Sequence, residues 1–284
     1  ASRFDAPLPL SLLLAGAAGA VLLTAASLAT TERSPGGTRR VATLSPRAVR
    51  VGRALAGAAF LAGVVAAVVV GVGGPRAAAG NFATVFVWPV WFRGVALLAV
   101  LLGNPWPALS PWRAAYRGLC RLEGDEVRLL GPPPARLGAW PALVSFLLLV
   151  GVVENLTVLP RSPPLTAAVV AAYGLWTVGG AALFGSPWLD RADPLGLLYR
   201  LFGRVAPWRG ATRPVAGAAA VAFVVAAVYT VTFDGFTETR LYRDLLLAVR
   251  EALGTGPPTS VPLYLVGLAA VLVAFLAAVR LGDA

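Results

Sequence analysis

Residues 54–74 read ALAGAAFLAGVVAAVVVGVGG, an unbroken apolar run without a charged side chain. A helix needs about 20 such residues to cross the roughly 30 Å hydrocarbon core of a bilayer. Six further stretches have the same character: 8–29, 84–102, 138–158, 165–185, 214–232 and 262–279. Only Arg93 and Glu154 are charged within the seven runs. The sequence therefore predicts an all-α integral membrane protein, one bundle of seven transmembrane helices over residues 1–284.

The composition agrees with this fold class and excludes several kinds of chemistry. Of the 284 residues, 58% are apolar and 13% charged, whereas an average soluble domain has about 45–50% and 25%. Histidine, lysine and methionine are absent, and there is one cysteine. A retinal Schiff base needs lysine, haem usually needs His, Met or Cys ligands, and zinc needs a Cys/His cluster. We expect no cofactor, no metal site and no catalytic residue from this chain.

The arginines predict the orientation, because segments rich in Arg or Lys stay in the cytoplasm. With the N-terminus outside and the C-terminus in the cytoplasm, 17 of the 24 arginines lie inside and six outside. The net charge of +11 then divides into +10 inside and +1 outside. This charge favours anionic lipids on the cytoplasmic face as the partner, not nucleic acid. The run 8–29 exceeds the roughly 7–15 apolar residues of a signal peptide, so we expect it to remain a helix.

An internal parallel repeat covers residues 84–122 and 165–205. Gly103-Asn104-Pro105-Trp106 and Ser110-Pro111 in the first copy match Gly185-Ser186-Pro187-Trp188 and Asp193-Pro194 in the second. Ser110 and Asp193 are suitable N-caps, and proline suits the first helical position. Each copy therefore predicts a short amphipathic helix after its span.

Two interpretations of these short helices are open. They either lie in the cytoplasmic membrane interface, with arginines reaching lipid phosphates, or pack as ordinary loop helices. The residues expected to contact lipid or a partner are Trp106, Trp112, Arg113, Arg117, Arg121, Trp188, Arg200 and Arg204. A third amphipathic helix, 239–253, is expected on the outer side, where it caps the bundle or docks a partner.

Arg93 and Glu154 are expected to pair, because an isolated charge at the bilayer centre costs at least about 2.5–3.5 kcal/mol. The pair either holds two helices in register or belongs to a polar site for a substrate or protons. Residues 232–235 are expected to close the sixth span with a turn; in the alternative interpretation, Asp234 and Glu238 face the same outer cavity as Glu154. The possible outer polar cluster consists of Asn155, Thr157, Asp234 and Glu238.

Several motifs resemble the polytopic membrane proteins known as fenitrothion hydrolase membrane subunits and their uncharacterised prokaryotic relatives. The motifs are Phe4-Asp5-Ala6-Pro7-Leu8-Pro9, Val87-Trp88 with Gly103-Asn104-Pro105-Trp106, Ser110-Pro111-Trp112-Arg113, Leu137-Gly138-Ala139-Trp140-Pro141, and Phe233-Asp234-Gly235. The resemblance implies a multi-pass protein of a prokaryotic plasma membrane. It also implies a complex of more than one subunit that hydrolyses an organophosphate ester. Because this chain has no histidine, a partner would supply most of such a site.

Three functions follow from these patterns. The first is a scaffold or anchor subunit of a hetero-oligomeric membrane complex, without a catalytic centre of its own. The second is a small-solute or ion permease built on the parallel repeat, with Arg93 and Glu154 as a gate or coupling pair. The third is a subunit of a membrane-bound organophosphate or ester hydrolase, as the resemblance implies.

Overall fold

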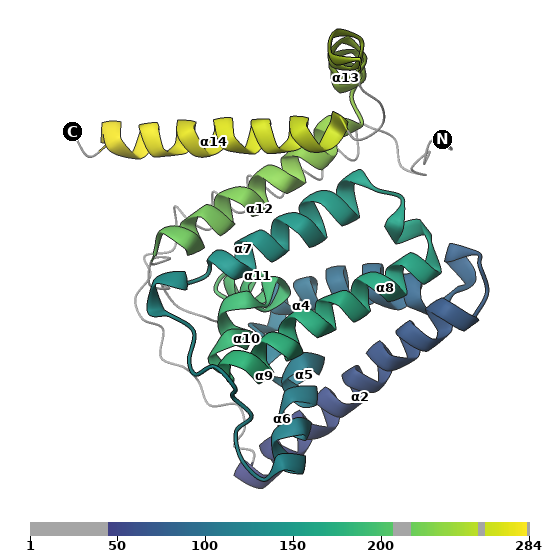
Figure 1. The fold of residues 1–284 in the computed structure, drawn as a ribbon, viewed down its shortest axis with the longest axis vertical. Coiled ribbons are helices and arrows are strands. Elements are labelled where there is room, and N and C mark those ends of the chain that lie inside the picture. Colours follow the sequence, from purple (N-terminus) through teal and green to yellow (C-terminus); the bar gives the residue numbers. More distant parts are fainter. Residues whose placement is uncertain (1–44, 207–216, 255–258, 283–284) are drawn as a thin grey trace.

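A computed structural model describes residues 45–206, 217–254 and 259–282. Every regular element in these ranges is helical (Figure 1). Six helices are long and apolar enough to span a membrane: Pro46–Gly73, Phe82–Leu102, Ala135–Glu154, Pro163–Phe184, Ala218–Thr237 and Ser260–Arg280. The protein is therefore an all-α integral membrane protein. The predicted span 8–29 lies outside the described residues.

The first described span, α2 (Pro46–Gly73), begins eight residues before the predicted run. Ser45 caps it, because the Ser45 hydroxyl accepts a hydrogen bond from the Ala48 amide at 3.1 Å. Proline follows directly at the first helical position, where its missing N–H costs nothing. The added turns carry Arg47, Arg50 and Arg53 as exposed side chains at one end of the span.

The next three spans each contain a π-helical segment. One span consists of α3 (Phe82–Val85), η2 (Phe86–Gly94) and α4 (Val95–Leu102). Another consists of α7 (Trp140–Phe146) and η4 (Leu147–Glu154), preceded by the turn η3 (Ala135–Leu137). The third consists of α8 (Pro163–Gly174), η6 (Leu175–Gly179) and α9 (Gly180–Phe184). Pro89 lies inside η2 and lacks the N–H that a regular helix needs. Short π segments are frequent at functional sites, and η2 and η4 carry Arg93 and Glu154.

The short helices follow these spans. They are α5 (Trp106–Leu109), α6 (Pro111–Glu123), α10 (Pro187–Ala192) and α11 (Pro194–Phe202). The last part of the chain forms α12 (Ala218–Thr237), α13 (Arg240–Leu253) and α14 (Ser260–Gly282). Two single turns, η1 (Ala78–Gly80) and η5 (Leu159–Arg161), join spans.

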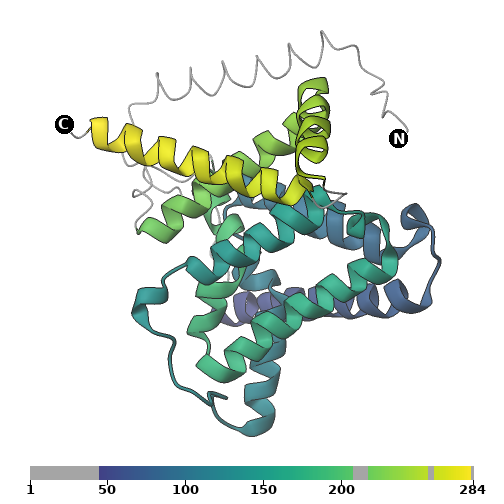
Figure 2. The same ribbon diagram turned by 45° about the horizontal axis from the view of Figure 1, so that its top comes forward.

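The spans form a packed group with an appended pair. Helix α2 packs along α8, while α11 lies between α4 and α7. Helix α12 packs on α7, and α14 packs chiefly on α12 (Figures 1 and 2). Helix α13 stands at the far end of α12. We call this end of the bundle the α13 end and the opposite end the α6 end.

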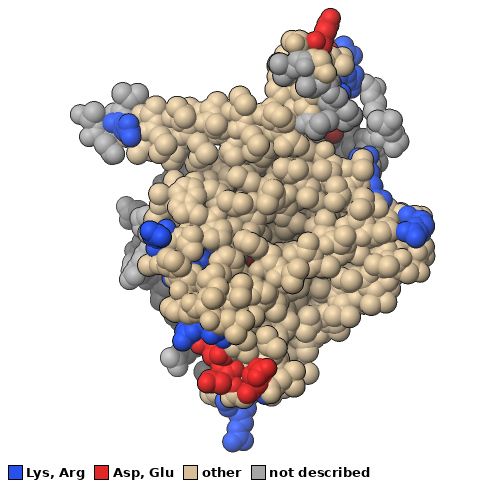
Figure 3. Space-filling model, viewed as in Figure 1, with Lys and Arg blue, Asp and Glu red and all other residues tan. Residues whose placement is uncertain are grey.

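In the view of Figure 3 charged side chains lie around the edge of the molecule, and most of the surface between them is uncharged. Many valine and leucine side chains of the spans are exposed, such as Val69, Leu175 and Val266. An exposed apolar belt of this kind is what a bilayer stabilises.

The two repeat copies share local backbone structure. Gly103 and Gly185 end their spans with nearly identical backbone angles, φ 80° and 81° with ψ 176° and −178°. Only glycine adopts this conformation readily. In each copy a one-turn or slightly longer helix follows, and then a capped helix. The Ser110 hydroxyl accepts from the Arg113 amide at 3.3 Å, and the Asp193 carboxylate from the Gly196 amide at 2.8 Å. Both predicted N-caps are therefore confirmed.

Helix α11, the capped helix of the second repeat copy, packs inside the bundle, which is the second of the two interpretations left open by the sequence. In α11 the side chains of Leu195, Leu197, Leu198 and Tyr199 are all buried, which is apolar burial around most of the helix. Helix α11 is therefore an internal element of the bundle, and α6 packs against α2, where Ala114 lies opposite Gly57. Packing inside the bundle removes more apolar surface from water than an interfacial position does.

Candidate functional site

A buried carboxylate lies at the centre of the bundle. Asp193 is 2% exposed and caps α11. One carboxylate oxygen accepts from the Trp106 indole N–H at 2.6 Å, and the other from the Gly196 amide at 2.8 Å. The Tyr173 hydroxyl also donates to the latter oxygen. Three donors from three elements therefore meet on one side chain, which satisfies a buried acid.

Burial raises the pKa of the Asp193 carboxyl, and the three donors offset this only in part. Tyr199, also in α11, lies close enough to the same carboxyl to interact with it electrostatically. Its hydroxyl donates to the carbonyls of Trp91 at 3.1 Å and Phe92 at 3.2 Å, both in η2. Burial raises the pKa of the Tyr199 hydroxyl well above its usual value. The Tyr199 hydroxyl is therefore a neutral donor that ties α11 to the π segment of the neighbouring span.

An aromatic cluster surrounds this centre. The Trp91 ring lies 6.1 Å from the rings of Trp106 and Tyr173, and 5.8 Å from that of Trp112. Among the described residues, the indole N–H groups of Trp91 and Trp112 are buried without a hydrogen-bond partner. Such groups cost about 1–3 kcal/mol each, which aromatic packing offsets by about 0.5–1.5 kcal/mol per pair.

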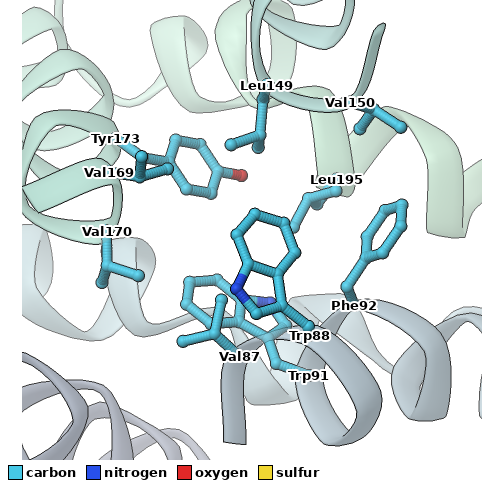
Figure 4. Close-up of a pocket in the computed structure, with 10 residues that line it drawn as sticks. All are labelled: Val87, Trp88, Trp91, Phe92, Leu149, Val150, Val169, Val170, Tyr173 and Leu195. Atoms are coloured by element: carbon cyan, nitrogen blue, oxygen red, sulfur yellow. The ribbon is translucent and has the colours of Figure 1, made fainter. Parts of the chain in front are cut away.

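A small cavity borders the cluster (Figure 4). Trp88, Trp91, Tyr173 and Leu195 line it together with neighbouring apolar side chains. Its volume of about 20 Å³ has room for a single water molecule. The centre is therefore a buried hydrogen-bonded cluster that holds two spans, α5 and α11 together. Within the described residues, no three Cys, Asp or Glu side chains are grouped to hold a metal ion.

The second polar site is on the surface of the bundle. The Arg93 guanidinium and the Glu154 carboxylate form a salt bridge of 2.8 Å, as the sequence predicts. The Arg93 side chain is 65% exposed and that of Glu154 13%. Arg93 lies in the middle of its span, whereas Glu154 is at the end of another, towards the α13 end. The long Arg93 side chain reaches across this offset.

The predicted outer polar cluster is assembled only in part. Asp234 is close enough to act electrostatically on Glu154, and the Asn155 amide donates to the Thr230 carbonyl at 3.4 Å. Thr157 instead bonds within its own segment, to the Val153 carbonyl at 2.7 Å. Glu238 is exposed where α12 ends. The prediction of a turn at 232–235 is wrong, because α12 continues to Thr237. The Thr232 hydroxyl donates to the Val228 carbonyl one turn earlier at 3.0 Å, a bond that a helix accommodates.

Three tryptophans expected to contact lipid are buried instead. Trp106 is in the Asp193 centre, Trp112 packs on Tyr173, and Trp188 donates to the Trp176 carbonyl at 3.2 Å. The prediction of lipid contact is wrong for these rings. Trp106 and Trp188 donate to acceptors within the bundle, and Trp112 is held by packing against the Tyr173 ring.

The arginines of the short helices stay outside the core. Arg113 pairs with Asp190 of the other repeat copy at 2.5 Å. Arg117, Arg121 and Arg200 are exposed, and Arg204 is half-buried. These side chains remain available for the lipid or partner contacts that the sequence predicts.

Sequence reasoning recognised Asp193 as a cap but missed its burial, and it missed Tyr173 and Tyr199 altogether. One signal was present: the five residues Leu195 to Tyr199 have no charged member, so the first part of this helix is apolar on every face and the first charge is Arg200. A helical segment that is apolar all round is a buried one, and its cap is then buried too. Comparison with known protein families, with curated proteins and with solved structures finds no match for this chain.

Proposed function

We propose that the protein is a membrane-embedded anchor subunit of a hetero-oligomeric complex in a prokaryotic plasma membrane. The observation that carries this proposal is Arg93, a mid-span arginine with 65% of its side chain exposed. Glu154 neutralises one side of the guanidinium, and the rest faces the surroundings of the bundle. A charge at this depth costs about 2.5–3.5 kcal/mol or more in lipid. A polar group of a partner helix would remove that cost.

Helix α14 supports the same proposal. It packs chiefly on α12 and leaves most of its apolar surface exposed, including Val266, Val273 and Leu276. Transmembrane helices associate through packing and interhelical hydrogen bonds. Among the described residues α14 contacts α12 and, through Tyr264, Gly151 of η4, and its exposed face is the one that we assign to another subunit.

The buried centre around Asp193 favours an anchor over a moving carrier. Hydrogen bonds of Asp193 and Tyr199 join α11 to two spans, through Tyr173 and the Trp91 carbonyl, and to α5, through Trp106. A carrier alternates between two arrangements of its repeats, and such movement would break these buried bonds. If the chain belongs to a hydrolase complex, as the family resemblance implies, its part is to hold a partner that bears the catalytic groups.

The test is the composition of the complex in native membranes. Mild extraction after chemical crosslinking should give this chain with a second membrane protein in fixed stoichiometry. The double variant Arg93→Leu/Glu154→Leu keeps the net charge and should release that partner. The matched control Arg161→Leu, outside the mid-span region, should retain it. A single uncomplexed chain in crosslinked membranes overturns the proposal, and solute flux in liposomes would then support the permease.

A further inference from the structure

An open apolar groove of about 330 Å³ runs between α2 and α8, with α6 as its floor. All of its lining side chains are apolar, and they include Val65, Val68, Val69, Trp112, Ala171 and Leu175. Val69 and Leu175 are largely exposed, so the groove opens towards the outside of the bundle. In a membrane protein that side faces the hydrocarbon chains of lipids.

Helix packing explains why the groove exists. At the α13 end α2 and α8 touch, because a Cβ on Gly71 would lie only 2.7 Å from the Ala167 side chain. At the α6 end α6 comes between them: its Ala114 side chain lies against Gly57 of α2, and its Trp112 ring lies against Gly174 of α8. The two helices therefore diverge towards the α6 end, and side chains do not fill the space between them.

The size of the groove fits one hydrocarbon chain. A dry protein cavity of about 150 Å³ accepts benzene, which has six carbon atoms. By that scale 330 Å³ accommodates on the order of a dozen methylene carbons. A single acyl chain of a phospholipid, lying along the groove, matches this volume.

Three arginines lie beyond the α6 end of the groove. The Arg117 guanidinium is 3.9 Å from the position of a Cβ on Gly57, one turn of α2 beyond the groove residue Leu61. Arg53 and Arg50 are four and seven residues before Gly57, so they share its face of the helix. All three are exposed, and none forms a salt bridge with a described acidic residue.

We propose that this groove binds one phospholipid with an anionic headgroup, with an acyl chain against Val65, Val69 and Ala171 and the phosphate at Arg117. Arg53 and Arg50 lie roughly 6–11 Å further along α2, at 1.5 Å per residue, and hold the remaining headgroup charge. Guanidinium groups suit phosphate oxygens because they donate several parallel hydrogen bonds. A partner helix would fill the apolar groove equally well but would leave these three charges unused. The arginine distribution predicts the cytoplasmic leaflet at this end, which is where anionic lipids are concentrated.

Native mass spectrometry of the detergent-purified chain tests the site with phosphatidylglycerol and phosphatidylcholine of the same acyl chains. We expect one retained phosphatidylglycerol and a preference for it over phosphatidylcholine. Arg117→Gln should lower that preference about fivefold, since one arginine near a lipid surface contributes about 1 kcal/mol. Arg121→Gln, an exposed arginine one turn further on α6, should leave it unchanged. Equal effects of the two substitutions, or equal binding of both lipids, overturns the assignment of the headgroup.

The groove itself is tested with a second matched pair. Ala171→Phe puts a ring into the groove and should abolish the retained lipid, whereas Ala172→Phe, on the exposed face of α8 outside the groove, should not. Phosphatidylglycerol with a photoreactive acyl chain tests the unmodified protein in the same way. Crosslinks should map to residues 61–69 and 170–178. Crosslinks spread evenly over the spans, or retention by Ala171→Phe, overturns the proposal.

Discussion

Substitution of Asp193 by asparagine tests whether the buried carboxylate holds the bundle together. Asparagine has the same shape and keeps one oxygen for the Gly196 amide and the Tyr173 hydroxyl. Its NH₂ group then faces the Trp106 indole N–H, where the carboxylate oxygen accepts at 2.6 Å. Two donors cannot bond to each other, so a buried N–H is left unsatisfied, at a cost of about 1–3 kcal/mol. Alanine leaves both Trp106 and Tyr173 without an acceptor and also removes the cap, for about 3–6 kcal/mol.

Thermal unfolding in detergent, followed by tryptophan fluorescence, measures this difference. At about 2–4 °C per kcal/mol for chains near this size, Asp193→Asn should lower Tm by about 2–12 °C, and Asp193→Ala by more. The control Asp190→Asn breaks the half-exposed pair with Arg113, and such pairs contribute about 0–1 kcal/mol. If both Asp193 variants unfold within error of Asp190→Asn, the buried hydrogen bonds do not stabilise the bundle as argued.

Three further outcomes are expected. Gly180→Ala places a Cβ 2.0 Å from the Trp188 indole nitrogen and should destabilise the protein by about 1–3 kcal/mol. The control Gly118→Ala adds a Cβ that meets nothing within 4 Å, and equal Tm values for the two variants would contradict this packing. Gly103→Ala forces a side chain into a backbone conformation at φ 80° and should cost about 1–3 kcal/mol, which chemical denaturation in mixed micelles can measure. Because the folded pKa of Asp193 is raised, the folded state binds more protons than the unfolded state above about pH 3.9. The stability difference between wild type and Asp193→Asn should therefore fall as pH rises from that value to the raised pKa and then level off; a difference that grows with pH would show the opposite shift.

The sequence predicts the helices well and their surroundings poorly. Apolar run length and proline or glycine at the ends determine where a span begins and ends, and these signals are local. Ser110 and Asp193 were identifiable as caps for the same reason. Whether α11 lies on the membrane surface or between α4 and α7 depends on which spans are neighbours, and no local pattern encodes that.

The two polar sites show the same division. Arg93 and Glu154 could be paired from sequence because they are the only charges in apolar runs. Trp106 resembles the aromatic residues that favour a membrane interface, so its pattern pointed to lipid, and no pattern singled out Tyr173 or Tyr199. Their actual partners are a carboxylate and backbone carbonyls up to 108 residues away in sequence, and a single sequence holds no record of such pairing.

The sequence distance of these bonds also determines the order in which the protein can be assembled during synthesis. Trp106 precedes its acceptor Asp193 by 87 residues, and the carbonyl of Trp91 precedes the Tyr199 hydroxyl by 108. The spans that begin at Pro46, Phe82 and Ala135 therefore leave the ribosome before the donor and acceptor groups of α11 exist. The nascent chain can close its centre only once residue 199 is released, while α12 and α14 are still to be made. Helix α12 then completes the core by packing Phe223 against Phe146 of α7, and α14 is the last described helix to be added.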